Sequence, residues 1–165
     1  AVPVCGVRSA PTVIYSDASF EPGQPARVGW VVFQPGLDPV GQTLVLDEAT
    51  TAQWKARSTD IFLAEAVCSV LVPFNLPGAF EGQDVLLFID NEAASAAVIR
   101  GASGSPDVDH MVQVAHAMFQ RLQARVWFEW INSEAKCSDG LSRDGFLDQW
   151  TRTQPWWLSV PCQPD

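Results

Sequence analysis

The segment that most constrains the fold is VLLFID at residues 85–90, a run of apolar residues that ends in an acid. A continuous apolar run of this length predicts a strand buried on both faces, as in the centre of a parallel sheet. Helix-prone sequence precedes and follows it, which is the pattern of parallel strands joined by helical crossovers. We therefore expect a sheet with a central parallel strand whose C-terminal end, marked by Asp90, lies at a cleft.

Strands and helices are expected in a fixed order along the chain. The first half predicts three strands joined by Pro- and Gly-rich turns, which indicates an antiparallel meander. A helix, a strand, further helices, a strand and a short helical segment follow. The predicted strands cover residues 12–20, 27–34, 42–48, 85–90 and 126–131. The first predicted helix begins at a cap on Ser58 or Thr59 and continues up to residue 74. The later predicted helices cover residues 91–100, 106–124 and part of 133–146.

This order predicts an α/β fold with a mixed five-stranded sheet and helices on both faces. The sheet would combine the antiparallel three-strand meander with two later parallel strands. A length of 165 residues is that of one ordinary domain, so we expect residues 1–165 to form a single unit. Residues 1–11 are expected to form a loose lead-in, and the Trp-rich residues 145–165 are expected to cap the core.

Composition and charge limit the function. The chain is 47% hydrophobic, but no apolar run approaches the roughly 20 residues of a membrane span. We expect a protein with no membrane partner that is located inside the cell, in the cytoplasm or nucleus. The net charge of -9 argues against a broad basic face that would bind phosphate backbones. Any nucleic-acid binding should therefore be local, with metal ions held by acids or a basic neighbouring domain supplying positive charge.

The four cysteines do not predict a structural metal. They lie far apart and lack the Cys/His spacing of zinc sites. Cys68 falls in an apolar helical segment and is expected to be a small core residue. Reduced thiols are the default expectation, and the spacing leaves a terminal Cys5–Cys162 disulfide open.

Acids interrupt four segments that otherwise have the character of core or of a site. Asp17 follows the apolar start of the first strand, Glu65 lies within an apolar helix, Asp90 ends the most hydrophobic strand, and Asp139 lies in the last helical segment. Each acid alone has an ordinary explanation, such as a cap, an ion pair or a solvated position. Together they would repel one another at low dielectric unless a cation neutralised them. Oxygen ligands suit Mg²⁺ or Mn²⁺, and two such ions about 3.5–4 Å apart can promote phosphodiester cleavage.

Four blocks of sequence carry a family resemblance. They are YSDAS with VGWVVF, AEAVCSVL, VLLFIDNEAASAAV and FEWINSEAKCSDGLSR. Their order and spacing resemble the ribonuclease H domains, especially those attached to the reverse transcriptases of retroelements. The resemblance covers most of the chain and implies a ribonuclease H-like fold.

The resemblance also implies a function. The protein would be a metal-dependent endonuclease that hydrolyses the RNA strand of RNA–DNA hybrids and leaves a 3′-hydroxyl and a 5′-phosphate. Asp17, Glu65 and Asp90 would hold two Mg²⁺ ions, for which Mn²⁺ can substitute, with Asp139 as a more mobile fourth ligand. A reverse transcriptase domain in the same polypeptide would be a partner, as in a polyprotein.

Three polar residues near these acids are candidates for substrate binding. By resemblance, Asn91 would contact the minor groove of the hybrid, and Ser19 or Arg143 would contact a phosphate. Each has an equally good structural role: Asn91 as a helix cap, Ser19 as a neighbour in the strand and Arg143 as a partner of Asp139. The other acids near these segments and the two histidines are expected to be solvated charges, surface residues or packing residues: Glu92, Asp107, Asp109, Glu134, His110 and His116.

The sequence departs from the family pattern before its last acid. Where the pattern leads us to expect Asn-Pro-Ala, the chain has Lys136, Cys137 and Ser138. Lys136, Ser142 and Arg143 lie three or four residues from Asp139, so a helix would place them on its face. Some cellular members carry a histidine in this loop, and residues 132–138 contain none.

The sequence leaves two alternatives open. The first is another nuclease of the ribonuclease H fold that acts on DNA, such as an exonuclease, a resolvase or a transposase-like enzyme. The second is a catalytically inactive, connection-like structural module, whose seven tryptophans could form a docking surface. The order of the blocks favours ribonuclease H over the first alternative. Retention of all four acids argues against the second.

Overall fold

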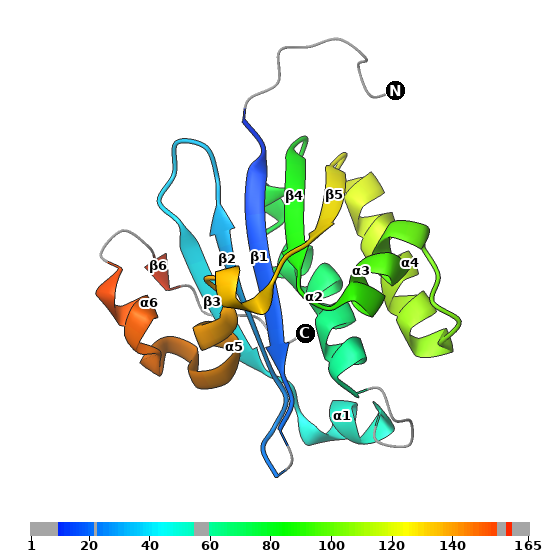
Figure 1. Ribbon diagram of the computed structural model, residues 1–165. Helices are drawn as coiled ribbons and strands as arrows, with labels where there is room; N and C mark the ends of the chain where they lie inside the picture. The colour runs from blue at the N-terminus through cyan, green and yellow to red at the C-terminus, as the bar shows by residue number, and fades with distance from the viewer. Residues whose placement is uncertain (1–9, 22, 55–59, 155–157, 160–165) are drawn as a thin grey trace.

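A six-stranded mixed sheet forms the centre of the molecule (Figure 1). The computed structural model describes residues 10–21, 23–54, 60–154 and 158–159. The strand order is β5-β4-β1-β2-β3-β6. The strands are β1 (Thr12–Ser19), β2 (Arg27–Phe33), β3 (Val40–Val45), β4 (Asp84–Ile89), β5 (Arg125–Trp130) and β6 (Leu158–Ser159).

The predicted pairing of the strands is confirmed. β1, β2 and β3 form the antiparallel meander, while β4 pairs parallel with β1 and β5 pairs parallel with β4. The two-residue strand β6 adds to this five-stranded sheet by pairing parallel with β3. β6 was not predicted, because two residues are too short to show an alternating pattern.

Helices cover both faces of the sheet, as predicted. They are α1 (Glu48–Trp54), α2 (Asp60–Asn75), α3 (Glu92–Arg100), α4 (Pro106–Arg121), α5 (Asp139–Asp144) and α6 (Gln149–Thr153). Gly29 of β2 faces Leu141 of α5, whereas its neighbours Val28 and Trp30 belong to the core that includes Leu63 of α2. Since successive side chains of a strand point to opposite faces, α2 and α5 lie on opposite sides of the sheet.

The predicted helix up to residue 74 is present as α2, which includes Pro73 and ends one residue later, at Asn75. The side-chain amide of Asn75 donates to Leu71 O at 3.0 Å and supports the last turn. The predicted caps of this helix, Ser58 and Thr59, lie outside the described residues. The helix α1 was not predicted. Asp47 is a signal for it, since its carboxylate accepts a hydrogen bond from Thr50 N, as an N-cap does.

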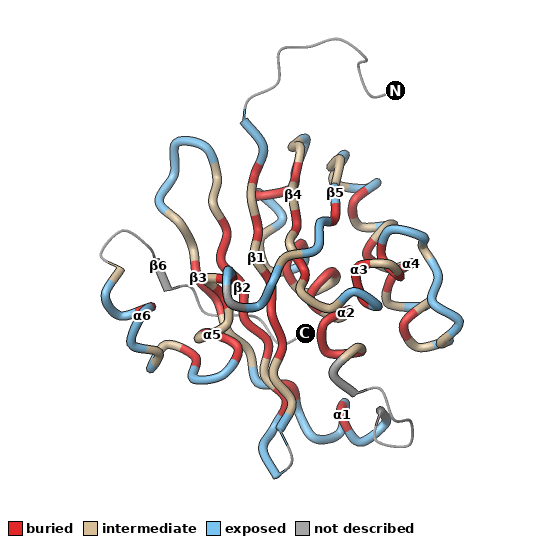
Figure 2. The backbone as a smooth tube through the Cα atoms, viewed as in Figure 1, coloured by how far each residue is buried: buried red, intermediate tan, exposed pale blue. Residues whose placement is uncertain are grey.

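The main core lies between the sheet and the layer formed by α2, α3 and α4 (Figure 2). Cys68 is fully buried there, which confirms it as a core residue. His116 is a packing residue, since its ring contacts Phe119 and Phe128 and its Nε2 lies 2.7 Å from Val98 O. Cys5 and Cys162 lie outside the described residues, as do most of the residues predicted to cap the core after residue 154.

Trp30 provides a test of this core. Its Nε1 donates to Gln42 Oε1 at 2.6 Å, and both side chains are buried. Trp30→Phe removes the donor and part of the volume, so we expect the free energy of unfolding to fall by about 1–3 kcal/mol. Trp127→Phe, at a residue that is 52% exposed, should change it by less than about 0.5 kcal/mol. Urea unfolding of both variants measures the difference, and equal losses would contradict this account of the core.

Among the described residues, no helix is both long and apolar enough to span a membrane.

Candidate active site

The register of two parallel strands brings Asp17 and Asp90 together. In the β1–β4 pair, Tyr15 lies opposite Phe88. The same register continued by two residues places Asp17 of β1 beside Asp90, which directly follows β4. Asp17 is buried, and the side chain of Asp90 is 14% exposed. The strand order therefore creates the first carboxylate pair without any contribution from the helices.

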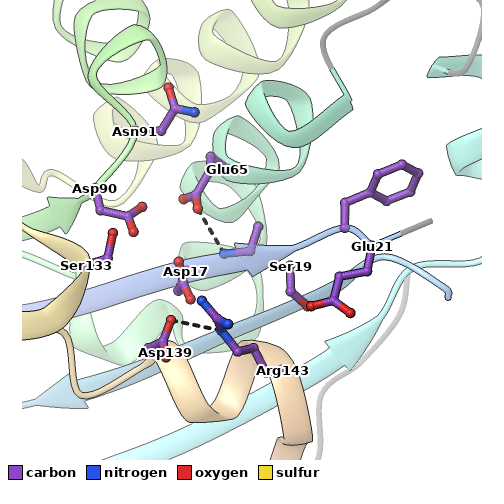
Figure 3. Close-up of a pocket in the computed structure, with 11 residues that line it drawn as sticks. Asp17, Ser19, Glu21, Glu65, Asp90, Asn91, Ser133, Asp139 and Arg143 are labelled. Atoms are coloured by element: carbon purple, nitrogen blue, oxygen red, sulfur yellow. Dashed lines mark hydrogen bonds and ion pairs between the residues drawn. The ribbon is translucent and has the colours of Figure 1, made fainter.

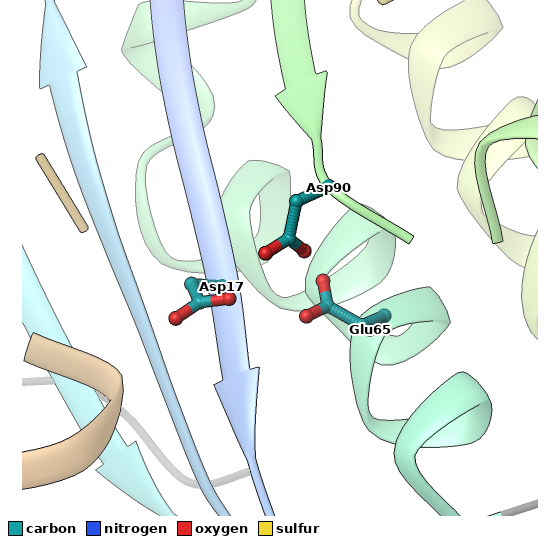
Figure 4. A group of neighbouring side chains, drawn as sticks. All are labelled: Asp17, Glu65 and Asp90. Atoms are coloured by element: carbon teal, nitrogen blue, oxygen red, sulfur yellow. The ribbon is translucent and has the colours of Figure 1, made fainter. Parts of the chain in front are cut away.

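Glu65 of α2 completes a group of three carboxylates (Figure 4). Its Oε1 accepts a hydrogen bond from Ala18 N at 3.0 Å, which fixes the helix against the end of β1. One carboxylate oxygen from each of Asp17, Glu65 and Asp90 lies within 4.8 Å of the others. The structure thus brings together three of the four predicted acids, from strand β1, the end of strand β4 and helix α2.

Lys136 lies among these acids and was not predicted as a site residue. Its Nζ is 3.0 Å from Asp17 Oδ1 and 2.8 Å from Asp90 Oδ1, and its side chain is fully buried. The expectation that Lys136 shares a helical face with Asp139 is wrong, because α5 begins at Asp139 and Lys136 precedes it. A lysine where the family pattern has asparagine, three residues before the last acid, is the signal that the sequence offered.

Ser142 of α5 holds the second oxygen of Asp17. Its hydroxyl donates to Asp17 Oδ2, and Ser142 is fully buried. α5 is in turn held close to the sheet, since Thr43 Oγ1 donates to Leu141 O at 3.0 Å. Both oxygens of Asp17 therefore have partners, Lys136 on one side and Ser142 on the other.

The three acids have different electrostatic surroundings. The pKa of Glu65 is raised to about 9, first by burial and then by the charges of Asp17 and Asp90, while Lys136 opposes the rise. Burial also acts to raise the pKa of Asp90, but the hydrogen bond and charge of Lys136 outweigh it and the pKa is lowered. Burial acts to lower the pKa of Lys136, and the surrounding carboxylates raise it above its usual value. Lys136 thus favours the charged form of Asp90, whereas burial favours the neutral form of Glu65.

The donor set fits a hard divalent cation. All three carboxylates offer oxygen, the ligand atom that Mg²⁺ and Mn²⁺ prefer. Glu65 Oε2 is buried and has no hydrogen-bond partner among the described residues. A buried polar atom without a partner costs free energy, and a cation held by Glu65 and its neighbours would satisfy it.

Asp139 lies at the edge of the same cleft, apart from the group of three. The cleft has a volume of about 340 Å³ and is lined by Asp17, Ala18, Ser19, Phe20, Glu21, Glu65, Asp90, Asn91, Ser133, Asp139 and Arg143 (Figure 3). The carboxylate of Asp139 is 38% exposed and accepts from Arg143 Nε at 3.1 Å. Asp139 thus lines the cleft at its exposed edge, with Arg143 as its partner.

Each candidate substrate-binding residue lines the cleft and also has a structural contact. Asn91 caps α3, since its Oδ1 accepts from Ala94 N at 3.0 Å. The hydroxyl of Ser19 donates to Ser142 O, and Arg143 pairs with Asp139. Of the residues expected to lie outside the site, Glu92, Asp107 and Asp109 occupy the first turns of α3 and α4, and His110 is exposed.

Solved structures of ribonuclease H domains resemble this chain. RNase H1 from the halophilic archaeon Halobacterium salinarum NRC-1 matches with a TM-score of 0.56 and 15% identity, over 83% of this chain and 98% of that one. The N-terminal RNase H domain of rv2228c from Mycobacterium tuberculosis, solved as a fusion with maltose-binding protein, matches with a TM-score of 0.56 and 14% identity, over 88% and 100%. No protein-family model and no curated protein matches the sequence. The structural likeness establishes the ribonuclease H-like fold.

Proposed function

We propose that the protein is a divalent-metal-dependent endonuclease that hydrolyses the RNA strand of RNA–DNA hybrids. One observation carries the proposal: Asp17, Glu65 and Asp90 converge within 4.8 Å at the wall of a cleft, in a ribonuclease H-like fold. Three carboxylates in a buried cluster are a liability to the fold unless cations neutralise them. Their position at a cleft, rather than inside the core, favours a site that receives a substrate.

The proposed roles follow from the contacts of each residue. Asp17, Glu65 and Asp90 would hold Mg²⁺, or Mn²⁺ in its place, and Asp139 would join as a fourth, more exposed ligand. Bound ions of this kind activate water for attack on a phosphodiester and stabilise the leaving oxygen. Ala18 N orients Glu65, and Ser142 orients Asp17, so both carboxylates are fixed before a substrate arrives.

The proposed substrate class agrees with the charge of the protein. The net charge is -9, and Arg143 is the only cationic side chain among the residues that line this cleft. Binding would therefore depend on few phosphate contacts, with the 2′-hydroxyl and the shape of the duplex distinguishing RNA from DNA. We further propose that a reverse transcriptase domain in the same polypeptide supplies the remaining affinity for the hybrid.

A panel of substrates tests this proposal. RNA–DNA hybrid, RNA duplex, DNA duplex and a four-way DNA junction of matched sequence are incubated with the full chain in Mg²⁺ and in Mn²⁺. We expect internal cuts in the RNA strand of the hybrid alone. Cutting of DNA duplex or of the junction would instead support another nuclease of this fold.

A second candidate function, an inactive structural module, is favoured by Lys136. Its ammonium already neutralises Asp17 and Asp90, as a purely structural ion pair would. Thermal unfolding with and without Mg²⁺ separates the candidates. An intact metal site predicts stabilisation by Mg²⁺ that disappears in Asp90→Asn, whereas a structural module predicts no response in either protein.

Arg143 provides a further prediction about hybrid binding. Its side chain is 59% exposed at the edge of the cleft, where it can reach a phosphate. Arg143→Met should weaken hybrid binding and lower the slope of log K against log salt by about 1. Arg121→Met, at an exposed position in the last turn of α4, is the matched control and should leave both unchanged. Fluorescence anisotropy at several salt concentrations measures these effects, and equal slopes for all three proteins would remove Arg143 from the interface.

A further inference from the structure

Lys136 occupies the position between the carboxylates where a cation would bind. Its Nζ lies within 3.0 Å of one oxygen of Asp17 and one of Asp90. The side chain is fully buried, although it precedes α5 on a short connection in which Asn132, Ser133 and Ala135 are exposed. The ammonium of Lys136 is therefore buried, although neighbouring residues of the same connection are exposed to solvent.

The hydrogen bonds of the site leave few oxygens for a divalent ion. Asp17 uses Oδ1 for Lys136 and Oδ2 for Ser142, and Asp90 uses Oδ1 for Lys136. Glu65 uses Oε1 for Ala18 N, and its Oε2 is buried without a hydrogen-bond partner among the described residues. An ion that binds Asp17 Oδ1 and Asp90 Oδ1 together would therefore take the place of the ammonium. Two cations at that point would also repel each other.

We propose that Lys136 is a built-in competitor of the divalent ion, and that an ion joins Asp17 to Asp90 only after the ammonium has left. In the free protein, Lys136 neutralises the two acids and stabilises the fold. In the metal-bound protein, its side chain lies outside the group of three carboxylates. This inference rests on the proposed function, since it concerns the same metal site.

Metal binding by lysine variants tests the proposal without measuring activity. Mn²⁺ is titrated into the full chain by calorimetry, with wild type, Lys136→Met and Lys136→Arg compared. Lys136→Met keeps the apolar stem but removes the charge, so we expect its Kd for Mn²⁺ to be at least about tenfold lower than that of wild type. Lys136→Arg keeps the charge and should bind as weakly as wild type. A Kd for Lys136→Met equal to or higher than that of wild type would overturn the proposal.

A second measurement uses the wild-type protein and does not depend on the folding of a variant. The sequence contains two lysines, Lys55 and Lys136, so reductive methylation can be assigned to each by mass spectrometry. Mn²⁺ should raise the methylation rate of Lys136 several-fold relative to that of Lys55. An unchanged ratio at a saturating Mn²⁺ concentration would contradict displacement of the ammonium.

The outcomes distinguish this inference from the proposed function. If wild type and Lys136→Met bind Mn²⁺ equally tightly, the inference fails and the metal site stands. If neither protein binds Mn²⁺, the metal site and the proposed function fail with it.

Discussion

Asp90→Asn is expected to lower the rate of cleavage of the RNA strand in a hybrid by roughly a thousandfold or more. The substitution keeps the shape of the side chain and an oxygen that can accept from Lys136, but it removes the charge that a divalent ion needs. Asp90 also contributes its backbone oxygen to Trp130 Nε1 at 2.8 Å, a contact that the substitution leaves in place. The fold should therefore survive while the activity is lost.

Single-turnover cleavage, together with thermal unfolding, separates these two effects. Asp38→Asn, in the exposed loop between β2 and β3, is the matched control and should cleave at the wild-type rate. A folded Asp90→Asn protein that retained wild-type activity would remove Asp90 from the catalytic group. Loss of activity in Asp38→Asn as well would show that the assay responds to net charge.

Gly29→Ala is expected to lower the stability of the protein and its activity together. A Cβ at Gly29 would lie 2.8 Å from the backbone of Leu141 and from the amide nitrogen of Ser142. The strand and α5 would have to separate, at a cost of about 1–3 kcal/mol. Gly29 lies opposite Asp17 in the β1–β2 pair, so the same displacement would move Ser142 away from Asp17. We expect lower activity together with lower stability.

The control for this substitution is Gly78→Ala. A Cβ at Gly78 meets no atom within 4 Å, and its stability should change by less than about 0.5 kcal/mol. Urea unfolding and hybrid cleavage by both variants measure the two effects. An unaltered Gly29→Ala protein would show that the close approach of α5 to the sheet is unnecessary for the site.

The strands and the three central acids could be predicted because each carries a local signal. The first five residues of VLLFID are apolar, so the acid that follows them is easily recognised. Glu65 is conspicuous as a charge within an apolar helix. Their convergence follows from the parallel pairing of β1 with β4 and from the crossover that places α2 against β1. These rules of topology apply to any chain with this order of elements.

Lys136 and Ser142 could not be placed in the same way. Both reach Asp17 across more than a hundred residues of sequence, through a connection whose path depends on the packing of α5 against Gly29. No periodic pattern encodes such a path. The separate position of Asp139 has the same cause. Asp139 is the first residue of α5, and its carboxylate pairs with Arg143, one turn later in the same helix, at the edge of the cleft.

The three carboxylates are proposed to hold a divalent ion for cleavage of a hybrid. The most direct measurement is incubation of the full chain with end-labelled RNA–DNA hybrid in Mg²⁺, in Mn²⁺ and in a chelator, with analysis of the product ends. We expect internal cuts in the RNA strand that leave a 3′-hydroxyl, appear with either ion and disappear in the chelator. Cleavage that persists in the chelator, or an intact RNA strand in both ions, would contradict the claim.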